Sequence, residues 1–285
     1  MFAPSRTTFE LMHRSSPTSR KILIIGGTSG LGLELARLLL YRGYDVIVTG
    51  RKETLFPEYK DHFKFFRNDL DNLEQTAILV KELCKSNHFD IVVNNAGILS
   101  PPCIITTKNG LEYTFQINFL SHLLIDEIIL RNNHEDKPVL IAAVTSPVYR
   151  IAKGDLAVFD DKSEYRAFKA YSNSKLYLAM MCKYFVERFP LTNLICIGFD
   201  PGIFSSGIDR MQNRIFRRLY TIASPFMRKP EKVAKVMAEI LERKDLISSS
   251  VYDHHSRIRA IPQTNESVWR KFWEDCYQII GPFLQ

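Results

Sequence analysis

The sequence lacks the features by which membrane, secreted and metal-binding proteins are usually recognised. No apolar run reaches the roughly 18 residues that a membrane-spanning helix needs, and there is no secretory signal core. The cysteines are dispersed, with neither a Cys-x-x-Cys pair nor histidines at zinc-ligand spacing. They are Cys84, Cys103, Cys182, Cys196 and Cys276. We therefore expect a cytoplasmic protein with reduced thiols, no metal and no transmembrane segment.

A nucleic-acid footprint is also missing. The net charge of +7 is compatible with a nucleic acid, an anionic membrane or a phosphate-bearing ligand, and selects none of them. Because no long block of Lys and Arg is interleaved with aromatic residues, we expect no nucleic-acid partner. Residues 1–20 are rich in Ser, Thr and Arg, with Glu10 as their only acid. This composition weakly resembles an organelle-targeting segment, but we favour a flexible, solvated tail over residues 1–19.

Short apolar runs alternate with amphipathic stretches along most of the chain. We expect strands at residues 21–25, 45–49, 63–66, 91–93, 139–144 and 193–197, and helices at 33–41, 73–84, 110–130, 165–188 and 230–243. No internal repeat or linker separates them, so residues 20–285 are predicted to form a single domain. The alternation predicts an α/β fold with a doubly wound parallel sheet and helices on both faces. Ligands bind such sheets beyond the carboxyl ends of the strands.

The less regular C-terminal part leaves two alternatives open. Residues 203–229 mix aromatic residues and arginines, and are predicted to form either a mobile lid over a pocket or a solvated basic helix pair. Trp269 and Trp273 stand at helical spacing near the C-terminus. Core packing or a dimer surface is expected there rather than a membrane anchor.

A glycine-rich turn follows the first expected strand. Residues 26–32 read Gly-Gly-Thr-Ser-Gly-Leu-Gly and stand between that strand and the first helix of a βαβ unit. Glycines there let the backbone approach a pyrophosphate, whose charge is favourable at a helix N-terminus. Gly-rich turns are common between any strand and helix, but this position favours nucleotide binding.

Tyr171 and Lys175 lie one turn apart on the expected helix 165–188 and therefore share one face. A phenol has a pKa of roughly 10, and a nearby ammonium group favours the phenolate and lowers that pKa. Such a pair suits acid/base chemistry near neutral pH. Taken alone, it is more typical of an ordinary amphipathic helix with a half-buried tyrosine and a solvated lysine.

The end of the second expected strand bears on the choice of cofactor. NAD-binding proteins usually place an acid there, which accepts hydrogen bonds from the ribose and repels a 2′-phosphate. This chain has Arg51 and Lys52 instead. A guanidinium that can pair with a phosphate favours NADP over NAD, although two solvated basic residues are the alternative interpretation.

With these residues in view, residues 20–243 resemble the short-chain dehydrogenase/reductase family. The turn at 25–32 matches the family's Thr-Gly-x-x-x-Gly-x-Gly, with Ile25 in place of Thr, and residues 94–97 match its Asn-Asn-Ala-Gly. Its serine after the fifth strand and its Pro-Gly motif match Ser146 and residues 201–202. Within the family, residues 109–112 and 170–176 resemble retinol dehydrogenase-like members.

The resemblance implies a Rossmann fold and a role for each matched residue. Tyr171 would be the acid/base, Lys175 would tune it and hold the nicotinamide ribose, Ser146 would hydrogen-bond the substrate oxygen, and Asn118 would position a water. Outside the family, Ser146 could simply form a turn and Asn118 could bond within a helix. The expected cofactor contacts are Gly26, Thr28, Ser29, Gly30, Leu31, Gly32, Arg51, Lys52, Asp69, Leu70, Asn95, Ala96, Gly97, Tyr171, Lys175, Pro201, Gly202, Ile203 and Ser206.

Together with these patterns, the resemblance implies an NADP-dependent oxidoreductase that interconverts a carbonyl and an alcohol by hydride transfer. Apolar side chains in residues 203–229 suggest a small apolar substrate, and we expect a homo-oligomer. The alternative is a catalytically idle dinucleotide-binding sensor or interaction protein on the same fold.

Overall fold

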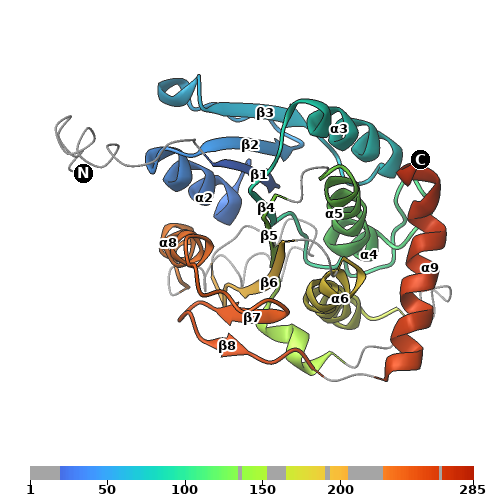
Figure 1. Cartoon of the computed structure of the whole chain (residues 1–285). Coiled ribbons are helices and arrows are strands. Elements are labelled where there is room, and N and C mark those ends of the chain that lie inside the picture. Colours follow the sequence, from blue (N-terminus) through green and yellow to red (C-terminus); the bar gives the residue numbers. More distant parts are fainter. Residues whose placement is uncertain (1–19, 134–136, 153–164, 190–192, 205–226, 263–264) are drawn as a thin grey trace.

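The computed structural model describes residues 20–133, 137–152, 165–189, 193–204, 227–262 and 265–285. An eight-stranded sheet forms the centre of this part of the chain, in the order β3-β2-β1-β4-β5-β6-β7-β8 (Figure 1). The strands are β1 (Lys21–Ile25), β2 (Asp45–Gly50), β3 (Phe63–Arg67), β4 (Ile91–Asn94), β5 (Val139–Val144), β6 (Leu194–Asp200), β7 (Ser250–Asp253) and β8 (Ile258–Arg259). All neighbouring strands are parallel except β7 and β8.

Helices cover both faces of the sheet, which confirms the predicted doubly wound α/β fold. Helices α2 (Gly30–Tyr41) and α8 (Pro230–Leu241) lie on one face. The other face carries α3 (Leu73–Ser86), α5 (Ser121–Arg131) and α6 (Ala167–Arg188), with α9 (Glu266–Leu284) packed outside them (Figure 1). The short helical segments are η1 (Pro57–Tyr59), α4 (Tyr113–Phe115), η2 (Gln116–Leu120) and η3 (Pro147–Ile151).

The alternation of side chains along each strand divides the core into two layers. In β1, Ile22 and Ile24 join the layer beneath α2 and α8, whereas Leu23 and Ile25 join the layer beneath α3, α5 and α6. Every residue of β4 and β5 is buried. Strands buried on both faces have almost continuous apolar sequences, which is why these short runs could be recognised.

The helix expected at 110–130 differs from the prediction at its start and in its regularity. Gly110 has a φ of 77° and lies in a turn, and the helical segment begins only at Tyr113. The carboxylate of Glu112 caps it by accepting hydrogen bonds from the amides of Thr114 (2.9 Å) and Phe115 (2.6 Å). Next comes η2, a π-helical segment, before α5 continues to Arg131.

The C-terminal elements were only partly predicted. Strands β7 and β8 were not expected, because each is short and their apolar pattern is brief. Trp269 and Trp273 on α9 are buried against rings of η2 and α6, so they pack in the core. Among the described residues, no helix is long and apolar enough to cross a membrane. The predicted tail, residues 1–19, and most of the predicted lid lie outside the described residues.

Candidate nucleotide and catalytic site

A cavity of about 790 Å³ opens at the carboxyl ends of the parallel strands. Strands β1 and β4 are neighbours there, and the chain proceeds outward from them in opposite directions, through β2 and β3 on one side and β5 and β6 on the other. This is the switch point at which doubly wound sheets bind their ligands. Most of the predicted site residues line this cavity. They are Gly26, Thr28, Ser29, Gly30, Leu31, Arg51, Lys52, Asp69, Leu70, Asn95, Ala96, Gly97, Ser146, Tyr171, Lys175, Pro201, Gly202 and Ile203.

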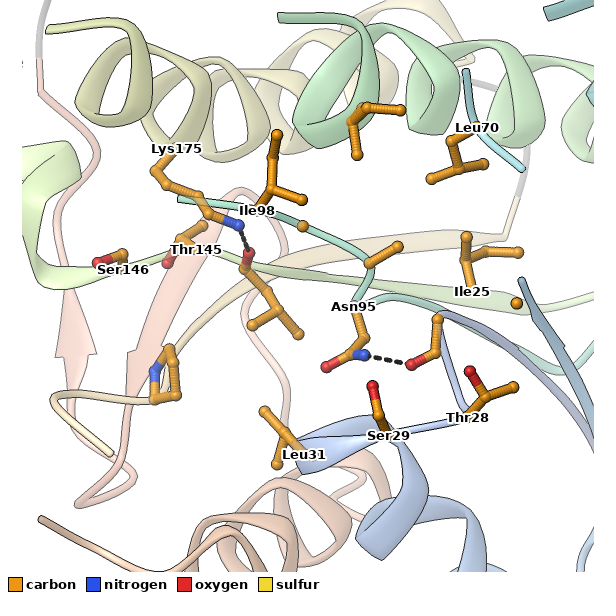
Figure 2. Close-up of a pocket in the computed structure, with 18 of the residues that line it drawn as sticks. Ile25, Thr28, Ser29, Leu31, Leu70, Asn95, Ile98, Thr145, Ser146 and Lys175 are labelled. Atoms are coloured by element: carbon orange, nitrogen blue, oxygen red, sulfur yellow. Dashed lines mark hydrogen bonds between the residues drawn. The ribbon is translucent and has the colours of Figure 1, made fainter. Parts of the chain in front are cut away.

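The glycine turn brings the N-terminus of α2 to this cavity (Figure 2). Gly26 has a φ of 83°, and a Cβ there would lie 2.7 Å from Cα of Ala96. Both the backbone conformation and the lack of space therefore exclude a side chain at this position. A Cβ on Gly32 would collide with the carbonyl oxygen of Gly26. Ser29 caps α2 without a side-chain hydrogen bond, and the first turn of α2 has no acid. The amides of this turn are therefore suited to an anion such as a pyrophosphate.

The loop after β4 is tied directly to the glycine turn. Nδ2 of Asn95 donates to the carbonyl of Gly26 at 2.7 Å (Figure 2), and the amides of Asn95 and Ala96 both donate to the carbonyl of Ile25, at 3.1 and 2.7 Å. The two segments therefore form one continuous wall of the cavity.

Lys175 is buried between the end of β5 and the loop after β4. Its Nζ donates to the carbonyl of Val144 at 2.9 Å (Figure 2) and lies 6.0 Å from the ring centroid of Tyr171. A Cβ on Gly97 would be 3.2 Å from this nitrogen. Burial lowers the pKa of Lys175 to about 8. A cation, a phenol and the hydroxyl of Ser146 thus face one cavity.

Asn118 is buried in the π-helical segment and does not line the cavity. Its Oδ1 accepts from the amide of Ile98 (2.8 Å), and its Nδ2 donates to the carbonyl of Ile98 (2.9 Å) and to Oγ of Ser174 (3.0 Å). Asn118 therefore holds the backbone of Ile98, whose side chain faces the cavity. Single π-helical turns are frequent at functional sites. Here the π-helical turn places the side-chain amide of Asn118 against the loop after β4, a contact that the sequence did not predict.

Arg51 and Lys52 directly follow β2 and lie at that end of the cavity. Arg51 and Lys52 are exposed, and no ion pair involves Arg51 among the described residues. Burial raises the pKa of the nearby Tyr113 hydroxyl, and the positive charge of the Arg51 guanidinium partly opposes that effect. Leu70 lines the same end, and its carbonyl accepts from Nε2 of Gln116 at 2.9 Å.

Two predicted site residues do not line the cavity, and one was not described. Gly32 and Asn118 lie behind its wall, and Ser206 lies outside the described residues. Phe204 and Met227 line the cavity and belong to residues 203–229, whose apolar side chains were expected to shape the pocket. The prediction missed the rest of the apolar lining, which consists of Ile98, Ile117, Val144, Pro147 and Val148. No motif marks these residues, because they come from segments that only the fold brings together. Among the described residues, no group of three or more His, Cys, Asp or Glu is placed to hold a metal ion.

Curated relatives support the resemblance found in the motifs. The chain is 22% identical over 273 residues to retinol dehydrogenase 11 of Homo sapiens, a match that covers 91% of this chain and 85% of the relative. It is 24% identical over 250 residues to a WW domain-containing oxidoreductase of Drosophila melanogaster, covering 82% of this chain. That match spans only 61% of the relative's length.

Solved structures share the fold. A short-chain dehydrogenase/reductase from Burkholderia multivorans with bound NADP has a TM-score of 0.65 at 21% identity, covering 85% of this chain and all of that one (100%). An NADH-dependent reductase complexed with NAD has a TM-score of 0.61 at 17% identity, covering 83% and 95%. The profile of the family described as short chain dehydrogenase matches residues 20–215. The chain therefore belongs to the short-chain dehydrogenase family of oxidoreductases.

Proposed function

We propose that residues 20–285 form one NADP-binding domain that interconverts a carbonyl and an alcohol on a small apolar substrate, with Tyr171 as acid/base. The observation that carries this proposal is that Tyr171, Lys175 and Ser146 line the same cavity as the glycine turn. The wall of that cavity fits a dinucleotide, because backbone atoms fill the space beside Gly26 and the N-terminus of α2 has no side-chain cap. A nicotinamide cofactor, when bound, would supply or accept the hydride.

Each polar group has a role that follows from its position. The phenol of Tyr171 would give a proton to the carbonyl oxygen in reduction and take it back in oxidation. The Lys175 ammonium, anchored on Val144, would stabilise the phenolate left behind. The Ser146 hydroxyl would donate to the substrate oxygen where negative charge develops. Asn118 would keep Ile98 and the adjoining loop in place. It would also position a water molecule near Lys175.

The preference for NADP rests on the end of β2. Arg51 and Lys52 face the cavity without a carboxylate paired to Arg51 among the described residues, so a 2′-phosphate would meet two cations. Neighbours of similar fold include one with bound NADP and one with NAD, so the fold alone does not select the cofactor. The apolar lining suits an apolar carbonyl or alcohol, and the retinol dehydrogenase relatives are consistent with that class.

The test is an assay of NADPH oxidation with a panel of apolar aldehydes and ketones, comparing the unaltered chain with Tyr171→Phe. We expect kcat to fall by at least about a hundredfold in the variant, because the proton donor is removed while the ring remains. NADPH affinity, measured by fluorescence titration, should change by less than about threefold. Turnover that survives the substitution unchanged would exclude Tyr171 as the acid.

The second candidate is a dinucleotide-binding sensor or interaction protein without turnover. It is favoured only by the distance of the relatives, whose identity is between 22% and 25%. Tight NADPH binding with no turnover on any member of the panel would support it. Retention of Tyr171, Lys175 and Ser146 at one cavity favours the enzyme.

A further inference from the structure

A cluster of polar side chains is buried directly behind the loop after β4. It consists of Asn94 at the end of β4 and of His122 and Asp126, one turn apart on α5. All three are 0% exposed. None of them lines the cavity or belongs to the proposed catalytic set. Burying two ionisable groups is costly unless their hydrogen bonds and protonation states are matched.

Hydrogen bonds join these residues into a chain that ends on the cavity wall. Asp126 Oδ2 lies 2.6 Å from Nδ2 of Asn94, and Oδ1 of Asn94 lies 3.1 Å from Nδ1 of His122. At the far end, Nε2 of His122 lies 2.9 Å from the carbonyl oxygen of Ala96. A carbonyl oxygen can only accept, so Nε2 of His122 carries a proton.

This arrangement leaves a conflict at the middle of the chain. If His122 is neutral with its proton on Nε2, its Nδ1 is an acceptor and faces Oδ1 of Asn94, which is also an acceptor. Two states remove the conflict. Either His122 is an imidazolium and Asp126 a carboxylate, or the Asn94 amide is rotated by half a turn. In the second state, Nδ2 of Asn94 donates to His122 and its oxygen accepts from a protonated Asp126.

The surroundings favour the uncharged state. Lys175 on α6 opposes a positive charge on His122, and Glu127 on α5 opposes a negative charge on Asp126. Arg131, Arg188 and Tyr277 form their hydrogen bonds with Glu127 rather than with Asp126. On β6, the thiol of Cys196 also faces Asp126 and offers it no positive charge. Within the described part of the chain, Oδ1 of Asp126 has no hydrogen-bond partner, which would be costly for a carboxylate.

The contact length agrees with this choice. A separation of 2.6 Å between Asp126 and Asn94 is short for N–H···O but ordinary for O–H···O. In addition, burial lowers the pKa of His122 to about 4 and raises the pKa of Asp126 well above its usual range.

We propose that Asp126 is protonated in the folded protein and that Asp126, Asn94 and His122 form an uncharged hydrogen-bond chain that positions the Ala96 carbonyl. The three are positioning residues for the nucleotide site, a consequence that rests on the proposed function. Ala96 also donates its amide to Ile25 at 2.7 Å, and it fills the space where Gly26 can have no side chain. A shift of Ala96 would therefore alter the shared wall of the cavity.

The proton held by Asp126 and His122 is detected by the pH dependence of stability in Asp126→Asn, and the nitrogen NMR signals of the His122 ring show which group carries it. In the unfolded chain Asp126 has a pKa of about 3.9, so above about pH 5 and below its raised folded pKa the folded state holds a proton that the unfolded state has released. Stability of the unaltered protein therefore loses this contribution as pH rises toward the folded pKa, whereas Asp126→Asn has no such loss. We expect the denaturation midpoint of Asp126→Asn, relative to the unaltered protein, to move upward across this range.

An imidazolium would overturn the proposal: both ring nitrogens of His122 would then carry a proton in the NMR spectrum of the unaltered protein, whereas the proposal expects a proton on Nε2 alone. A carboxylate paired with an imidazolium holds the same single proton and gives the same pH dependence, so the NMR signals decide between the two states. A midpoint difference that does not vary with pH would also overturn the proposal, because the pair would then hold no proton. The NMR measurement needs no variant and stands even if Asp126→Asn does not fold. Asp61→Asn, at an exposed position, is the matched control and should give a midpoint difference that does not vary with pH. None of these measurements requires a cofactor.

The positioning role is tested by NADPH titration of two His122 variants. Gln offers one donor and one acceptor, as neutral His does, so we expect His122→Gln to bind NADPH within about threefold of the unaltered protein. His122→Leu leaves the Ala96 carbonyl without its partner, so we expect about tenfold weaker binding. Equal affinities in the two variants would contradict the role. If the unaltered protein did not bind NADPH, the proposed function would fail while the pH test of Asp126 would still stand.

Discussion

At the scale of single residues, backbone groups fix the side chains of the proposed chemistry. Lys175 is held by the carbonyl of Val144, and Asn118 is held by both backbone groups of Ile98. Because carbonyls and amides are placed by the sheet and loops, these side chains are oriented before any ligand binds. Preorganisation of this kind is what catalysis by positioned charges requires.

The Lys175 cation should be visible in the pH dependence of carbonyl reduction. Its pKa is lowered to about 8 by burial, so in the free protein the positive charge is present below that pH and is lost as pH rises through it. We expect kcat/KM to fall above about pH 8, because a neutral amine stabilises the phenolate less. Lys175→Arg stays charged at every pH of the experiment, so its remaining activity should lack this inflection. The same inflection in both proteins would assign it to another group.

Arg51 should decide the choice between the two nicotinamide cofactors. We expect Arg51→Asp to weaken NADPH binding by roughly 10- to 100-fold, since a charge-assisted hydrogen bond is replaced by repulsion. NADH binding should change by less than about threefold. Lys235→Asp, which makes the same change of charge at an exposed position on α8, should leave both affinities unchanged. Equal affinity of the unaltered protein for NADPH and NADH would remove the preference for NADP.

At the scale of elements, the site depends on how closely α2 approaches the loop after β4. Gly32 lies in the first turn of α2, where Cβ would meet the carbonyl oxygen of Gly26 and lie 2.5 Å from Nδ2 of Asn95. Backbone atoms and a bonded amide cannot move aside as the end of a flexible side chain could. The third glycine of the turn is thus required by packing, although it does not line the cavity.

We therefore expect Gly32→Ala to lower NADPH affinity by more than about tenfold. Helix propensity alone would favour Ala by roughly 1 kcal/mol. Overpacking against a fixed backbone costs typically about 1–3 kcal/mol, and here the strain falls on the nucleotide loop. Glu34→Ala, a half-exposed position of the same helix, should keep affinity within about twofold. Fluorescence titration of both variants distinguishes a local clash from a general effect on α2.

The elements also show how much of the secondary structure could be predicted from sequence patterns. The six predicted strands and most helices are present, with ends displaced by a few residues. The break at Gly110–Glu112 and the π-helical segment were not predicted, because a long apolar face looks the same in a regular helix and in one with an inserted residue.

At the scale of the whole molecule, α9 closes the structure by packing outside α3 and α5. Its rings join those of Phe119 and Tyr177, and the hydroxyl of Tyr277 donates to the buried Glu127 at 2.6 Å. Arg188 lies over the ring of Tyr277 at 4.4 Å and pairs with the same carboxylate. Residues 121–130 of α5 are consequently all buried. The predicted homo-oligomer stays a prediction.

Removing the Tyr277 hydroxyl should loosen this closure. We expect Tyr277→Phe to lower the free energy of unfolding by about 1.5–3 kcal/mol, the range for hydrogen bonds to charged groups, because Glu127 loses one of its three partners. Urea denaturation measures the change. Tyr59→Phe, at a half-exposed site on η1, should change it by less than about 0.5 kcal/mol. No difference between the two would mean that the apolar contacts alone hold α9.

The sequence by itself determined the fold class, the family and most of the cavity wall. Buried parallel strands require apolar runs, and a dinucleotide-binding turn requires glycines. Both features can therefore be recognised in short segments of the sequence. The tertiary structure decided what depends on residues distant in sequence. It assembled the apolar lining, placed Asn118 behind the wall, and buried His122 and Asp126 against Asn94. Burial and partners set the protonation of such groups, and neither can be read from local sequence.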